Sequence, residues 1–333
     1  MQALRRSRLL LILALAVLPR QQVIAQVTQS CSGSAVTRPD LSIELALDHG
    51  QKVFRQGEIV RLRIQYSSRS ESKYLLDNRN YDRSGRLDGL DLICLQPDLG
   101  ADPLDDYFHS FAGFASGGLF SEPQITVKPL WTEMELNEWR SLPPGEYRLS
   151  ILSKRVSEGN QSNPKSWKAV SLQSNWITFR IIEAEPVWQS SILSGAIKTL
   201  DSSKSTEEET ENAARELRFL NSEDAARELV RRFWRSSPEN LRWDLEAGLW
   251  GNPFRRTAIR EMKSILRESR DGNRRWFIDV LVNLEMQTDS RFRQLRYDSE
   301  LAVREKDPGS SCEKEHKRRA SEYELRAASG TLK

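Results

Sequence analysis

The sequence has 333 residues, enough for about two domains, and its 38% hydrophobic content is sufficient for packed cores. Its 50 Lys+Arg and 47 Asp+Glu give a formal net charge of +3, but the first 25 residues carry four arginines and no acid, so the remainder is near neutral, with 46 basic against 47 acidic residues. Proteins that bind nucleic acid usually show a basic excess on one face or domain, so this balance disfavours nucleic acid as a partner.

Residues 1–25 have the layout of a secretory signal peptide. A basic stretch up to Arg8 precedes the apolar run Leu9–Leu18, which is too short to span a bilayer, and small residues end the segment at Ala25. We expect cleavage after Ala25 and export of the mature protein to the periplasm or the extracellular space, without stable insertion into a membrane. A buried N-terminal helix and lipidation at Cys31 are alternatives that fit the residues less well.

Alternation of apolar and polar residues predicts a β-rich domain over residues 26–182. The pattern is clear in Leu41–Leu47 and Val60–Tyr66, and further strands are expected at Ile125–Leu130, Trp131–Leu136, Tyr147–Leu152 and Trp176–Ile182. Six or seven short strands separated by turns, with no helical period between them, are typical of an antiparallel sandwich.

Two segments of this domain resemble strands of bacterial immunoglobulin-like sandwich domains. Phe54–Leu62 (FRQGEIVRL) is similar to the strand that starts with Gly-Glu and an apolar residue in such domains. Leu142–Leu149 (LPPGEYRL) is similar to the Pro-Pro-Gly strand near their end. The resemblance implies an immunoglobulin-like β-sandwich and does not indicate a ligand.

The long connection Asp77–Glu122 is the candidate binding loop, because long ordered loops on rigid scaffolds often bind ligands. The candidate contact residues are acidic and then aromatic: Asp105, Asp106, Tyr107, Phe108, Phe111, Phe114 and Phe120. The alternative, which we favour, is that the aromatic side chains pack the loop onto the sheet and the aspartates are solvated. The aspartate spacing does not fit the helix-loop-helix calcium pattern, and we expect neither a metal nor a cofactor.

Three cysteines are present, and one disulfide is expected in an exported protein. Cys31 and Cys94 lie in the same predicted domain and are the candidate pair. The odd count leaves at least one cysteine, Cys312 in this pairing, as a free thiol or in an intermolecular bond.

No catalytic motif is recognised in the sequence. In Gly113–Gly117 the serine stands in the fourth position, whereas a nucleophile elbow has it in the third. The zinc-protease, phosphate-loop and dinucleotide signatures are absent. We therefore expect a protein that is not an enzyme, with an unrecognised carboxylate site as the alternative.

After Pro186 the apolar period becomes 3.6, typical of helices. We expect a linker or bridging helix over 183–204, helix pairs over 205–290, and a charged, disordered or weakly helical tail over 291–333. Ser205–Glu208 predicts a capping box with Ser205 as the cap. The sequence Ala-Ala-Arg-Glu-Leu occurs at 213–217 and again at 225–229. The second helix of one pair is expected to start near Ser222 and that of the next pair near Asn252, a period of about 30 residues that is typical of stacked helical arrays.

These helices resemble HEAT or armadillo-type repeats, most closely in Ala213–Phe233 and Gly251–Leu266. The resemblance implies a short α-solenoid that binds a protein or peptide; the alternative is a helical bundle that serves as a spacer. Arginines near helix ends form a candidate basic strip for acidic partners, the alternative being a solvated face balanced by glutamates. The strip consists of Arg231, Arg232, Arg235, Arg255, Arg256 and Arg260.

The sequence thus predicts an exported β + α protein, an immunoglobulin-like sandwich followed by a HEAT-like solenoid. Two interaction-type folds and the missing catalytic motifs favour a non-catalytic binding or scaffold protein that engages a protein partner. A carbohydrate- or protease-binding module that acts through Asp77–Glu122 is the alternative. The patterns identify neither the partner nor the oligomeric state.

Overall fold

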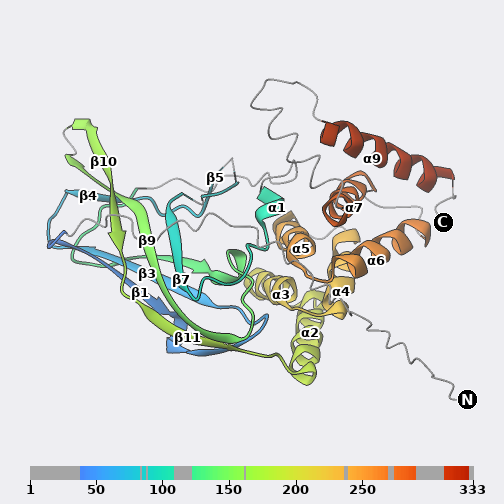
Figure 1. Cartoon of the computed structure of the whole chain (residues 1–333), viewed down its shortest axis with the longest axis horizontal. Coiled ribbons are helices and arrows are strands. Elements are labelled where there is room, and N and C mark those ends of the chain that lie inside the picture. The colour runs from blue at the N-terminus through green and yellow to red at the C-terminus, as the bar shows by residue number, and fades with distance from the viewer. Residues whose placement is uncertain are drawn as a thin grey trace, which may run out of the picture. The chain divides into compact units, whose positions relative to one another are not determined.

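The computed structural model describes residues 38–82, 85–87, 89–108, 122–160, 163–235, 239–268, 274–289 and 311–329, all within one structural unit. Strands come first along the chain and helices follow, so the fold is of the mixed β and α class (Figure 1). The predicted signal peptide 1–25 and Cys31 lie outside the described residues.

Strands β1 (Leu41–Leu47), β3 (Arg61–Ser68) and β8 (Leu130–Glu135) form one antiparallel sheet in the order β1-β3-β8. Alternation along β3 buries Leu62 and Ile64, whereas Arg61 and Arg63 lie on the opposite face of the sheet. The strands predicted at Leu41–Leu47 and Val60–Tyr66 are therefore present within about a residue.

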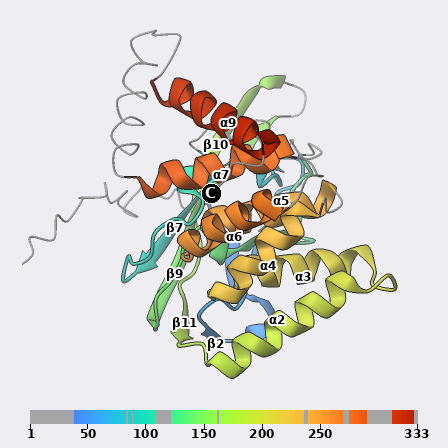
Figure 2. The ribbon, with the colours of Figure 1, turned by 90° about the vertical axis from the view of Figure 1, so that its right-hand side faces the viewer.

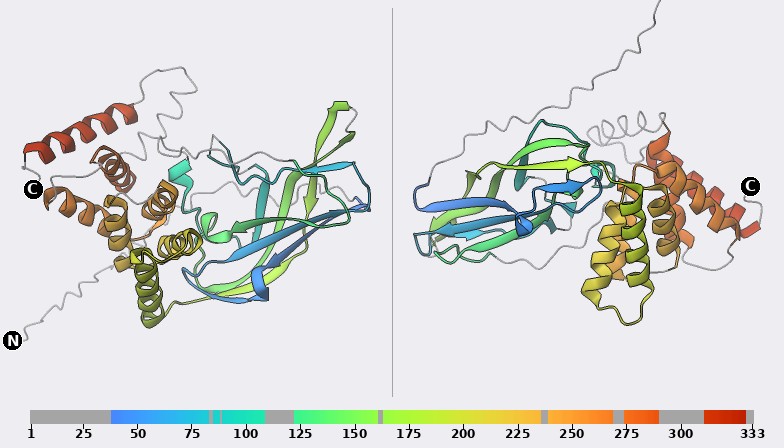
Figure 3. Two further views of the ribbon diagram at one scale, coloured as in Figure 1. Left: turned by 180° about the vertical axis from the view of Figure 1, so that it is seen from behind. Right: turned by 90° about the horizontal axis from the view of Figure 1, so that it is seen from below.

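The second sheet has the strand order β10-β9-β11-β2, with β4 and β7 also paired to β9. Its strands are β2 (Val53–Arg55), β4 (Tyr74–Leu76), β7 (Asp91–Gln96), β9 (Gly145–Asn160), β10 (Asn163–Gln173) and β11 (Ile177–Ile182). The pair β2–β11 is parallel, so the sheet is mixed and not purely antiparallel as predicted. The reason is that β2, which lies between β1 and β3 in the sequence, does not join the first sheet. It pairs instead with β11 at the edge of the second sheet. Figure 3 shows β9 and β10 as one long hairpin.

The predicted strand at Ile125–Leu130 is wrong. Among the described residues, this region has only an isolated bridge between Leu75 and Gln124 before β8 begins at Leu130. Ile125 is buried all the same, which explains the apolar pattern. The sheets share one core, where the Tyr66 and Ser153 hydroxyls are 2.9 Å apart.

Short elements complete the strand region. Strands β5 (Tyr81–Asp82) and β6 (Gly85–Arg86) form a small pair, and the turns η1 (Asp48–Gly50) and η2 (Leu136–Glu138) follow β1 and β8. Helix α1 (Asp105–Phe108) is a single turn within the candidate binding loop.

Each helix packs against its next or next-but-one neighbour along the chain: α2 against α3, α3 and α4 against α5, α4 against α6, α6 against α7, and α7 against α9 (Figure 2). Their bounds are α2 (Pro186–Asp201), α3 (Glu207–Phe219), α4 (Glu223–Trp234), α5 (Glu239–Gly251), α6 (Arg255–Glu268), α7 (Arg274–Thr288) and α9 (Ser311–Ser329). None of the helices in the described ranges has the length and apolar character needed to cross a membrane.

The cap of α3 corrects the predicted one by a residue. Thr206, not Ser205, is the N-cap, because its hydroxyl accepts from the Glu209 N–H at 3.2 Å while the Glu209 carboxylate accepts from the Thr206 N–H at 2.7 Å. The Ser205 hydroxyl instead donates to the Thr199 carbonyl at 2.9 Å, near the end of α2.

Helix α9 lies within the range predicted as a disordered or weakly helical tail. Its Tyr323 hydroxyl donates to Glu285 of α7 at 2.8 Å, and Arg319 lies 3.6 Å from Asp289. Lys263 of α6 also reaches Glu285, at 2.6 Å, so one carboxylate joins three helices.

Candidate functional site

The strand region and the helices meet at a tight turn between β2 and β3. Gly57 has φ +88°, and an added Cβ would lie 2.9 Å from the Phe219 carbonyl oxygen and 3.2 Å from the Asn221 nitrogen. Both the backbone conformation and the close approach therefore require glycine here. Nearby, Arg55 pairs with Glu185 at 2.9 Å and lies over the Trp188 ring.

The candidate binding loop crosses the same junction. Tyr107 is 3% exposed, and its ring centroid lies 5.2 Å from that of Trp243 and 5.4 Å from that of Trp250. The Phe108 ring also packs near Trp243, with the two ring centroids 5.9 Å apart. These aromatic side chains thus pack against α5, whereas the packed-loop alternative had them on the sheet.

The acidic candidates of the loop lie beside the same helices. The Asp106 carboxylate is 3.6 Å from the Arg255 guanidinium, and Asp105 is exposed at the start of α1. Phe111, Phe114 and Phe120 lie outside the described residues.

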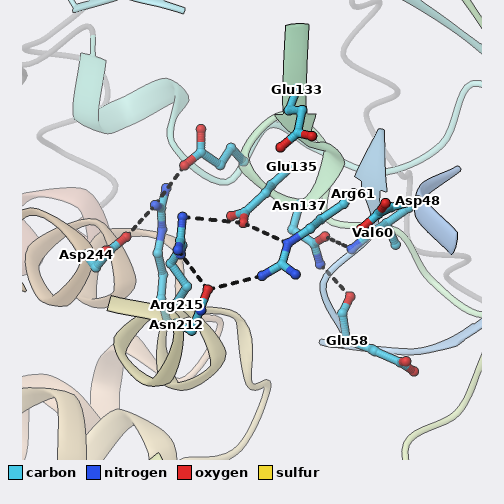
Figure 4. Close-up of polar contacts among 12 residues, drawn as sticks. Asp48, Glu58, Val60, Arg61, Glu133, Glu135, Asn137, Asn212, Arg215 and Asp244 are labelled. Carbon is cyan, nitrogen blue, oxygen red and sulfur yellow. Dashed lines mark hydrogen bonds and ion pairs between the residues drawn. The ribbon is translucent and has the colours of Figure 1, made fainter. Parts of the chain in front are cut away.

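A cleft of about 560 Å³ opens where β3, β8 and the turn after β8 face α3 and α5. Arg61, Glu135, Asn212 and Arg215 are among the residues that line it, and Figure 4 shows the contacts that join them; Tyr81 and Trp243 contribute aromatic side chains. This volume falls within the range of small-ligand sites in proteins. The cleft is therefore the candidate functional site.

The strand side of the cleft is a ladder of opposite charges. The register places Arg61 opposite Glu135 and Arg63 opposite Glu133 on neighbouring strands. The Arg63 Nε lies 3.0 Å from Glu133 and 3.1 Å from Asp48, so this arginine is paired with two carboxylates. Cross-strand pairs of this kind fix side-chain positions more than they stabilise the fold.

On the other side of the cleft, residues of helix α3 contact the Arg61–Glu135 pair. The Asn212 side-chain oxygen accepts from Arg215 at 2.8 Å and from Arg61 at 3.3 Å. The Glu135 carboxylate lies 3.6 Å from Arg61 and 4.0 Å from Arg215, both beyond hydrogen-bonding distance. The central carboxylate is thus held by charge and not by short hydrogen bonds.

Arg218 of α3 is the buried link beneath the cleft. Its side chain is 2% exposed, and its Nη1 donates to Glu138 at 2.8 Å and to Asp244 at 3.0 Å. The Tyr81 hydroxyl donates to the other oxygen of Glu138. A charge this deeply buried requires such partners. The Arg218 guanidinium therefore links Glu138, in the turn after β8, to Asp244 of α5.

Burial and the acidic neighbours raise several pKa values in the cleft. Burial, and then Glu138, hold the pKa of Glu135 above its ordinary value. Burial also raises the pKa of Asp244 although Arg218 works against it, and burial with Glu138 places the pKa of Tyr81 well above 10.0. Further negative charge is therefore disfavoured in this part of the cleft.

The predicted basic strip divides into two groups. Arg231 pairs with Glu261 at 2.9 Å, Arg232 pairs with Glu228 and Asp201, and Arg255 donates to the Trp250 carbonyl. The remaining three, Arg235, Arg256 and Arg260, are exposed and have no carboxylate partner among the described residues.

Cys94 is fully buried and disulfide-bonded. Its partner is not among the described side chains, so the pair Cys31–Cys94 stays a prediction. Within the described ranges, no cluster of three or more His, Cys, Asp or Glu side chains is suited to holding a metal ion.

The central residues of the cleft were not among the sequence candidates, although a signal for them exists. Arg61 and Arg63 alternate along one strand, and Glu133 and Glu135 alternate along another. Such matched patterns indicate a cross-strand ladder once the pairing is known. Comparison with known proteins adds no family: no family model matches the chain, and no curated protein matches it.

Proposed function

We propose that this chain is an exported, non-catalytic binding protein. Its finer architecture would be an immunoglobulin-like β-sandwich joined to a short HEAT-like helical array. Two sheets around a common core, and helices that pack against their next or next-but-one neighbour along the chain, support that architecture. The basic, apolar and small residues of 1–25 support export.

The observation that carries the binding role is the cleft between the strands and the helices. Its charged groups come from both parts, and most are already paired with one another before a ligand arrives. A site whose side chains are fixed in advance loses little conformational entropy when it binds. The arrangement therefore suits recognition of a ligand.

A protein partner is the proposed occupant of the helical surface. Arg256 and Arg260 stand one turn apart on α6, so their exposed side chains lie on the same face. An acidic segment of a partner complements two arginines that have no carboxylate partner in the described part of the chain. This pair replaces the six-residue strip as the proposed contact.

Charge reversal tests the partner proposal. The double variant Arg256→Glu/Arg260→Glu is compared with Lys198→Glu/Lys204→Glu, which makes the same change in net charge at exposed positions elsewhere. Capture of proteins from envelope and secreted fractions is measured with the full chain. We expect one specific protein to be captured by wild type and control and lost with the arginine variant. Equal capture by all three proteins would show that the α6 surface is not the contact.

A further inference from the structure

The cleft borders an exposed face of the first sheet, because Glu133 belongs both to this face and to the cleft lining. Trp131 of β8 is 53% exposed on this face, opposite Gln65 of β3, and Glu133 stands two residues further along the same strand at the rim of the cleft. On the far side of Gln65 the register places Glu44 of β1. On this face, the residues that the register places next to the exposed indole are therefore polar. The centre of a protein–protein contact is usually apolar, so this face suits a ligand that is itself mostly polar.

Hydrogen-bonding groups dominate the cleft as well. Every residue that lines it, except Met134, has a side chain that donates or accepts hydrogen bonds. Some of this capacity is unused: within the described part of the chain, the Arg215 guanidinium, whose side chain is 31% exposed, donates a short hydrogen bond to Asn212 alone, and Glu135 has only the long contacts to Arg61 and Arg215. A ligand with several hydroxyl groups, each both donor and acceptor, satisfies groups of both kinds.

The charges of the cleft favour a neutral ligand. At an effective dielectric constant of about 20, a unit charge 4 Å from another gains or loses about 4 kcal/mol. A charged ligand between Arg61 and Glu135 meets one attraction and one repulsion of this size, and it must still give up its own hydration. Burial, the main cause of the raised pKa of Glu135, disfavours any further charge here, and Glu138 adds repulsion for an anion. A neutral ligand leaves the existing pairs intact.

We propose that the cleft and the adjoining sheet face bind a neutral saccharide, with a sugar ring stacked on Trp131 and hydroxyl groups bonded to Glu135 and Arg215. The proposal rests on the binding role given above and specifies the ligand of its cleft. A sugar ring presents C–H groups on its faces and hydroxyl groups at its edge. This matches an aromatic platform beside planar polar side chains. The cleft volume leaves room for more than one sugar unit, and the sheet face extends the path to Trp131.

The test is a titration of the full chain with cellohexaose, chitohexaose, maltohexaose and xylohexaose, followed by calorimetry and by tryptophan fluorescence. We expect at least one of the four to bind with saturation. Trp131→Ala should weaken that binding by about tenfold, the loss of one aromatic contact. Arg215→Gln should weaken it by about fivefold, the loss of one hydrogen-bonding group. The matched controls are Trp176→Ala, an exposed tryptophan outside the cleft lining, and Arg227→Gln on α4; both should bind as wild type does.

Two results would overturn the proposal. The first is that none of the four sugars binds more tightly than about 10 mM, or that Trp131→Ala and Arg215→Gln bind as wild type does. The second is that oligogalacturonate, hexaglutamate or hexalysine binds in place of the neutral sugars and is sensitive to Arg215→Gln, in which case the cleft takes a charged chain. Thermal melts of each variant verify that it is folded. Loss of protein capture on reversing Arg256 and Arg260 with sugar binding intact, or the converse, separates this proposal from the partner proposal.

Discussion

Glu246 of α5 offers a sharp test of the electrostatics of the helical core. Glu246 is only 3% exposed, and its carboxylate accepts a hydrogen bond from the Trp276 indole N–H at 3.0 Å. Burial raises the pKa of Glu246 from an ordinary 4.5 to about 7; Trp276 and Arg242 work against the shift, and Asp279 adds to it. We predict that Glu246→Gln stabilises the protein above neutral pH and has little effect in acid.

The size follows from the pKa shift. A change from 4.5 to about 7 is about 2.5 units, which corresponds to about 3 kcal/mol at about 1.4 kcal/mol per unit. Because the folded pKa is the higher one, the folded protein binds more protons than the unfolded chain between the two values. The free energy of unfolding of wild type therefore falls as pH rises from 4.5 to about 7, and is level beyond. Glutamine keeps the hydrogen-bond acceptor for Trp276 and has no such dependence.

Urea unfolding at a series of pH values from 4 to 8 measures this difference, with about 1.4 kcal/mol as the scale of one pKa unit. The expected stability gain of Glu246→Gln is near zero at the acid end and about 3 kcal/mol at pH 8. Glu324→Gln, an exposed glutamate in α9, is the control and should show no such trend. A gain that is the same at every pH, or a loss at pH 8, would refute the reasoning that burial sets this pKa.

Three further predictions concern the junction and the cysteines. Gly57→Ala should lower the free energy of unfolding, measured in urea, by more than about 2 kcal/mol. Alanine is strained at this positive φ, and its Cβ would lie 2.9 Å from the Phe219 carbonyl oxygen; a loss below about 0.5 kcal/mol would contradict that close approach. Arg218→Met should lower the free energy of unfolding by about 3–5 kcal/mol at pH 7, because two carboxylates stay buried without their cation. The loss should be smaller at pH 4, because burial raises the pKa of Asp244 and the neutral form of this carboxyl tolerates burial; an equal loss at both pH values would point to lost packing. Alkylation of unfolded, non-reduced protein should label fewer thiols than after reduction, since Cys94 is disulfide-bonded; equal labelling would contradict this.

Local periodicity was enough to predict the strands whose two faces differ most. Leu41–Leu47 and Val60–Tyr66 alternate because one side faces the core and the other faces solvent. The same rule missed β7, since both faces of Asp91–Gln96 are largely buried and the strand does not alternate. It also assigned a strand to Ile125, which is buried by the fold without belonging to one.

The N-cap of α3 and the packing partner of the loop aromatic residues are set by contacts with other parts of the chain, which the local sequence does not reveal. Ser205 and Thr206 are both good caps by type, and the preceding helix decides between them, because the Ser205 hydroxyl bonds to Thr199. The aromatic residues of the loop were recognised as packing groups, but their target was not. Tyr107 packs against Trp243, whose position depends on the way α5 lies against the strands.

The cleft could not be predicted from the sequence for the same reason. The contacts that form it serve both ligand binding and the stability of the fold. The contacts that place its groups join residues far apart in sequence, such as Arg61 with Asn212 and Glu138 with Arg218. Those contacts also hold the strand region and the helices together. A ligand that broke them would weaken the junction, whereas a neutral ligand that bonds to their unused groups adds to it. We therefore expect a bound saccharide to raise the melting temperature by the same amount at low and high salt, because it changes no charge pair. A stabilisation that disappears in high salt would show that the ligand acts on the ion pairs instead.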